Sequence, residues 1–78
     1  MLILKNVRKE KNRIYADYYP EWSEKFNMIY YDISNEIFSG SMVGFEFETK
    51  NHLAHAKFAL MDMAKGEREI KDCKIMWY

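Results

Sequence analysis

The period of the hydrophobic pattern changes near residue 50. Before that point, apolar and polar side chains alternate over short segments, which is typical of β-strands. From Asn51 to Lys65, apolar side chains recur at helical spacing, and Gly66 follows as a left-handed stop. The sequence therefore predicts an α+β fold, in which the helix and most of the sheet come from separate parts of the chain.

The alternating segments predict four strands before the helix and one strand after it. The predicted strands are Leu2 to Val7, Arg13 to Tyr19, Lys25 to Ile33, Glu36 to Val43 and, after the helix, Ile70 to Tyr78. Arg8 to Asn12 is a polar connector in which Asn12 could accept a left-handed conformation. If the hairpins are sequential and the helix crosses back over one face, the last strand lies antiparallel beside the first. We expect a single domain, residues 1–78, with a largely antiparallel sheet of four to five strands in the order 4-3-2-1-5 and one helix on one face.

Alternation in the second predicted strand separates two faces. The expected core face carries Ile14, Ala16 and Tyr18, and the opposite face carries Tyr15, Asp17 and Tyr19. The third predicted strand is apolar on both faces, which is typical of a central strand. Its outer side chains therefore need a cover or a partner.

The predicted helix carries a single apolar stripe. Thr49 or Asn51 can cap its start. Phe58 and Met61 fall off the stripe, and a monomer seldom exposes a large apolar patch, so we expect a homodimer. The stripe consists of Leu53, Ala56, Leu60, Met63 and Ala64.

Composition and charge exclude several classes of protein. The 78 residues include 12 basic and 12 acidic side chains, so no net charge attracts nucleic acid or an anionic membrane. The basic side chains nevertheless gather in residues 1–16, and the single Cys73 excludes an internal disulfide. The apolar run Met1 to Leu4 is too short for a signal peptide or a membrane span, so we expect a cytoplasmic protein.

Four short segments together resemble a family of small uncharacterised bacterial proteins. They are Tyr18 to Pro20, Tyr31 to Ile37, His55 to Leu60 and Met76 to Tyr78. The resemblance covers most of the chain and implies a compact bacterial cytosolic domain. That family has no assigned activity, so no functional residue is carried over from it.

The sequence offers few residues for catalysis or metal binding. His52 and His55 lie three residues apart on one helix face, with Glu48 just before the helix, but no third ligand stands at a defined spacing. We expect no metal or other cofactor, and half-exposed histidines near the helix start. Cys73 alternates with Ile75, which predicts a small buried hydrophobe and no catalytic thiol. Phosphate loops and nucleophile elbows are also absent from the sequence, so we expect no enzyme activity.

Aromatic residues, at 17% of the chain, are the main excess. Tyrosines in strands often keep the ring in the core and the hydroxyl in water. On an open sheet they can also bind a protein surface, where tyrosine and tryptophan are enriched. We therefore expect an interaction module that acts through a protein partner or self-association. The alternative is RNA or single-stranded DNA binding through the basic, aromatic first hairpin, although net neutrality opposes it. The predicted partner surface comprises Tyr15, Tyr19, Trp22 and Tyr30.

Overall fold

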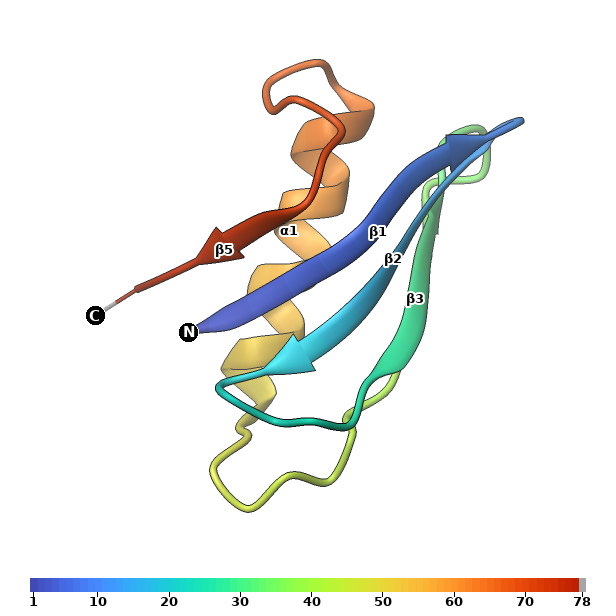
Figure 1. The fold of residues 1–78 in the computed structure, drawn as a ribbon. Coiled ribbons are helices and arrows are strands. Elements are labelled where there is room, and N and C mark those ends of the chain that lie inside the picture. Colours follow the sequence, from blue (N-terminus) through green and yellow to red (C-terminus); the bar gives the residue numbers. More distant parts are fainter. Residues whose placement is uncertain (78) are drawn as a thin grey trace.

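The computed structural model, which describes residues 1–77, contains a five-stranded antiparallel sheet and one helix within that part of the chain (Figure 1). The strand order β4-β3-β2-β1-β5 confirms the predicted α+β fold and the predicted place of the last strand. Tyr78, the end of the last predicted strand, lies outside the described residues. The elements are β1 (Leu2–Glu10), β2 (Arg13–Pro20), β3 (Asn27–Asp32), β4 (Ile37–Ser39), α1 (Lys50–Ala64) and β5 (Cys73–Ile75).

The first hairpin is longer than predicted. β1 continues to Glu10, because Arg8 to Glu10 pair in register with β2, and backbone pairing overrides their polar composition. Only Lys11 and Asn12 connect the two strands, and Lys11 takes the left-handed conformation (φ 55°) that the sequence suggested for Asn12. The polar connector predicted from Arg8 onward is therefore wrong.

The two edge strands are shorter than predicted. β4 pairs with β3 only from Ile37 to Ser39, after which the chain leaves the sheet at Gly40. β5 pairs only with Leu2 to Leu4 of β1. β1 continues to Glu10 and β3 begins at Asn27, so each of these strands extends beyond the short ladder that it forms with its edge strand.

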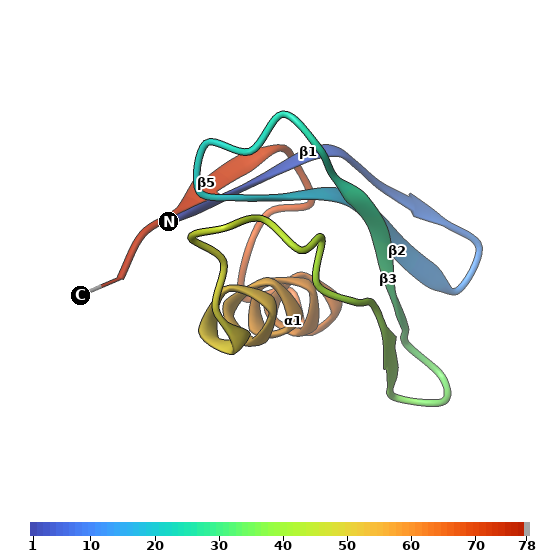
Figure 2. The same ribbon diagram turned by 90° about the horizontal axis from the view of Figure 1, so that it is seen from below.

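The core lies between α1 and one face of the sheet (Figure 2). Ile14, Ala16 and Tyr18 are fully buried, as the alternation predicted. The buried stripe of α1 is turned slightly from the predicted one. Leu53 and Ala64 are only partly buried, and the fully or nearly buried helix residues are His52, Ala56, Ala59, Leu60 and Met63.

The helix ends follow the predicted signals. Thr49 precedes the first turn with extended backbone, and its N–H donates to His52 Nδ1 at 2.9 Å. Gly66 adopts φ 78° after the last turn, and its N–H donates to the carbonyl of Met63 at 3.2 Å. Within residues 1–77, no helix is long and apolar enough to cross a membrane.

A bulge in β1 shifts the register of the first hairpin. Lys5 pairs with Asp17, but the next paired residue is Arg8, opposite Tyr15, and Asn6 between them has φ 53°. The extra residue turns Val7 toward the core, where it packs against the buried cluster. Arg8 consequently faces away from α1, on the side of the sheet that carries Tyr15.

Candidate interaction surface

The face of the sheet opposite α1, which we call the outer face, carries the predicted tyrosines. Tyr15 and Tyr19 project from β2 and Tyr30 projects from β3, and all three are half-buried. The rings of Tyr15 and Tyr30 are cross-strand neighbours with centres 5.6 Å apart. No helix covers this side of the described chain, and only the segment between β2 and β3 rises over one end of it (Figure 2).

Each of these tyrosines has a cation over its ring. The distances from the charged group to the ring centre are 4.8 Å for Lys5 and Tyr19, 5.0 Å for Arg8 and Tyr15, and 4.3 Å for Arg13 and Tyr30. Such pairs contribute roughly 0.5 to 1 kcal/mol each at exposed sites. The cations hold the rings in place.

Two further apolar side chains extend the surface. Phe26 packs on Tyr19 with ring centres 5.0 Å apart and stays 47% exposed. Met28 is 54% exposed, and its sulfur lies 3.8 Å from Arg8 Nη2. Exposed apolar groups next to rigid aromatic rings are typical of protein contact surfaces.

The outer face carries charges of both signs. Arg8 Nε donates to Glu10 at 3.2 Å, and Arg13 Nε lies 3.4 Å from Asp32 Oδ2. Asp17 stands between the aromatic rings of β2, directly across from Lys5. The cations of the first hairpin therefore do not form a purely basic patch.

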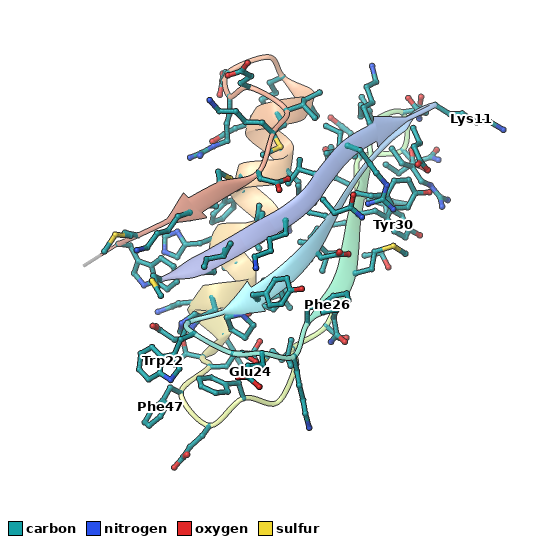
Figure 3. The ribbon with its side chains drawn as sticks, in the orientation of Figure 1. Lys11, Trp22, Glu24, Phe26, Tyr30 and Phe47 are labelled. Carbon is teal, nitrogen blue, oxygen red and sulfur yellow. The ribbon has the colours of Figure 1, made fainter. Side chains whose placement is uncertain are left out.

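Trp22 lies at the end of the outer face and not on it. Figure 3 shows Trp22 and Tyr30 on opposite sides of Phe26, with Trp22 near the lower end of the sheet. Trp22 is 63% exposed and packs on Phe47, with ring centres 5.4 Å apart, and on Phe45 at 6.1 Å. The structure thus brings Tyr15 and Tyr30 together, extends the surface to Tyr19, and places Trp22 in a neighbouring aromatic cluster.

The two histidines both pack on Trp77, and His52, whose ring centre lies 4.9 Å from that of Trp77, also makes hydrogen bonds. His52 is buried, which corrects the expectation of a half-exposed side chain, because its Nε2 lies 2.7 Å from Glu21 Oε1. His52 Nδ1 accepts from the Thr49 N–H, which can only donate, so Nε2 carries the proton that is donated to Glu21. His55 is half-buried and stacks on Trp77 with ring centres 4.1 Å apart.

Glu48, the carboxylate considered beside His52 and His55 as a metal ligand, anchors the chain before α1. Its carboxylate accepts from the Tyr18 hydroxyl at 2.6 Å and from the N–H groups of Val43 and Gly44 at 3.1 and 2.8 Å. Burial and this carboxylate raise the pKa of Tyr18 far above its ordinary value. Within residues 1–77, no three His, Cys, Asp or Glu side chains are grouped so that they could hold a metal ion.

Cys73 packs against the edge of the core. Its side chain is partly buried in β5, and burial raises the pKa of the thiol. A raised pKa disfavours the thiolate, which is the reactive form. This environment is that of a small hydrophobic side chain.

Comparisons with protein-family models, curated proteins and solved structures found no match to this chain. The resemblance to a bacterial family therefore stays a prediction. Sequence reasoning identified the tyrosines of the surface by their alternation, but it missed the position of Arg8, which depends on the bulge at Asn6.

Proposed function

We propose that this protein is a non-catalytic interaction module that binds a protein surface, either of another protein or of a second copy of itself, through the outer face of its sheet. The observation that carries the proposal is the set of three half-buried tyrosines on a face that no helix covers within residues 1–77. Tyrosine offers a large contact area at a low cost in side-chain entropy, because only its two side-chain torsions must be ordered. The cations over Tyr15, Tyr19 and Tyr30 restrict these rings further before binding.

The mixed charges of the outer face favour a protein over a polyanion. Asp17 and the exposed Glu10 stand on this face beside the cations, and both carboxylates would approach a phosphate backbone. A protein partner can match charges of both signs. The lack of any net charge on the chain points the same way.

Single-stranded nucleic acid is the second candidate, because cations beside exposed rings also suit stacked bases and phosphates. The two candidates differ in their response to salt. Binding through phosphate contacts weakens steeply as salt rises, whereas an aromatic protein contact changes little. A titration with a fluorescent oligonucleotide between about 50 and 200 mM salt covers the range in which this difference is large.

Photo-crosslinking in living cells tests the proposed function. A photoreactive phenylalanine analogue replaces Tyr30 on the outer face in one variant, and Phe58, which is 54% exposed on α1, in the matched control. We expect light-dependent adducts with protein at position 30 and markedly fewer at position 58. Equal labelling at both positions, or none at position 30, would contradict the proposal, and adducts that nuclease removes would favour nucleic acid.

We extend the proposal to a bacterial cytoplasm, as the sequence predicts. Absence of catalysis also stays a prediction. It is supported by the contacts of His52 and Glu48, whose polar atoms are engaged in holding the fold.

A further inference from the structure

Three rows of side chains cross the outer face from β1 through β2 to β3. We call them the Lys5 row, the tyrosine row and the Glu10 row. The register of the strands defines their members: Lys5, Asp17 and Met28 in the Lys5 row, Arg8, Tyr15 and Tyr30 in the tyrosine row, and Glu10, Arg13 and Asp32 in the Glu10 row.

The two outer rows carry opposite patterns of charge. From β1 to β2, the Lys5 row presents a cation and then a carboxylate, Lys5 and Asp17. The Glu10 row presents a carboxylate and then a cation, Glu10 and Arg13. The tyrosine row lies between them, so the outer face is complementary to its own copy after a half turn.

We propose that the partner is a second copy of this chain, docked face to face about a twofold axis that runs along the tyrosine row. This inference rests on the proposed function and names its partner. The axis reverses the strand direction and places each strand over the same strand of the other copy. Lys5 then lies opposite Glu10, and Asp17 lies opposite Arg13, and the symmetry produces each of these pairs twice.

The aromatic rings supply the centre of this interface. Tyr15 and Tyr30 lie on the axis, so the rings of the two copies meet there and lose their contact with water. Arg8 also lies on the axis, and the Glu10 carboxylate at 3.2 Å from its Nε offsets its charge. Apolar contact at the centre with charged pairs around it is the usual anatomy of a specific interface.

Within residues 1–77, the only segment that rises over the outer face is compatible with this arrangement. It joins β2 to β3 and reaches the face at Tyr19, where Phe26 packs on the ring. Tyr19 lies beyond the Lys5 row, away from the axis. The half turn therefore brings this segment toward the turn at Lys11 and Asn12 of the other copy and keeps it out of the space between the tyrosine rows.

A charge-swap experiment tests the proposal with the full chain. Lys5 and Glu10 are both exposed, so Lys5→Glu and Glu10→Lys should leave the fold intact, which thermal unfolding checks. In a dimer of either variant, the residues at positions 5 and 10 carry like charges across the interface. When the two variants are mixed, one chain is acidic at both positions and the other chain is basic at both, so every contact between positions 5 and 10 becomes attractive.

Sedimentation equilibrium measures the outcome. We expect the wild-type chain to dimerise at micromolar concentration, each variant alone to dimerise at least about tenfold more weakly, and the equimolar mixture to recover the wild-type mass. Lys57→Glu, the same reversal at an exposed position of α1, should dimerise like the wild type. A wild-type monomer, variants that dimerise normally, or a mixture that stays monomeric would each overturn the proposal. If the wild type is monomeric while position 30 still crosslinks to a different protein, the twofold dimer is wrong and the proposed function stands.

Discussion

The guanidinium carbon of Arg8 lies 5.0 Å from the ring centre of Tyr15, and it does so because β1 bulges at Asn6. In a regular strand, Val7 would occupy the place opposite Tyr15, and Arg8 would point toward the core side. One residue in the left-handed conformation thus decides which side chains of β1 after Asn6 lie on the outer face. Tyr15 owes its neighbouring cation to that bulge.

The bulge predicts an unequal response to substitution at Asn6. Asn6 has φ 53°, a conformation that asparagine tolerates and β-branched residues resist. We expect Asn6→Val to lower the free energy of unfolding by about 1 to 2 kcal/mol, and Asn6→Gly to leave it nearly unchanged. Urea unfolding of both variants checks this, and equal stability of the two would show that the left-handed residue is unimportant.

The helix packs through Leu60, which is fully buried. We expect Leu60→Ala to lower the free energy of unfolding by about 2 to 5 kcal/mol, because it removes buried surface and leaves a cavity. Phe58→Ala is the control, since that ring is 54% exposed on the same helix and should have a much smaller effect. Thermal unfolding of both variants checks this. A larger loss of stability for Phe58→Ala than for Leu60→Ala would show that the wrong face of α1 has been assigned to the core.

The hydrogen bond from Tyr18 to Glu48 links the middle of the sheet to the chain before α1. Tyr18→Phe removes the hydroxyl at 2.6 Å from a carboxylate, and hydrogen bonds to charged groups contribute about 1.5 to 3 kcal/mol. We expect a loss of that size in chemical unfolding. Tyr30→Phe, which removes a hydroxyl from a half-buried ring on the outer face, should cost much less, and similar losses for both would contradict the role assigned to Glu48.

Acid should weaken the turn after β3 through Asp32. The N–H of Asn35 donates to this carboxylate at 3.1 Å, and Arg13 lies beside it, so the pKa of Asp32 is below its ordinary value of about 3.9. The ionised Asp32 therefore contributes fully to the free energy of unfolding at pH values above its pKa in the unfolded chain. This contribution is lost as the pH falls through the lower pKa that Asp32 has in the folded protein.

Urea unfolding between about pH 6 and pH 2, at one protein concentration, measures the effect on stability. We expect Asp32→Asn to be less stable than the wild type at neutral pH and to lose less stability on acidification. Glu36→Gln, at an exposed position in the same turn, is the control and should follow the wild-type curve. Parallel curves for Asp32→Asn and the wild type would contradict the assignment.

The fold could be predicted because it follows from local patterns. The alternation of apolar and polar residues predicted that Ile14 faces the core and Tyr15 faces away from it. Helical spacing and Gly66 predicted α1. The short connections between the strands limited the number of possible strand orders in the sheet. The burial of His52 could not be predicted, because its partner Glu21 stands 31 positions earlier in a loop. The outer face was predictable only in part. Its tyrosines follow from the alternation, whereas the positions of Arg8 and Glu10 depend on the register of β1 after Asn6.

The central claim, that a second copy docks on the outer face, is tested most directly by NMR spectra of the labelled wild-type protein at rising concentration. We expect the backbone amide signals of Arg13, Tyr15 and Tyr30 to shift progressively with concentration, while those of Lys57 and Phe58 on α1 stay in place. Spectra that do not change with concentration, or shifts centred on α1, would contradict the claim.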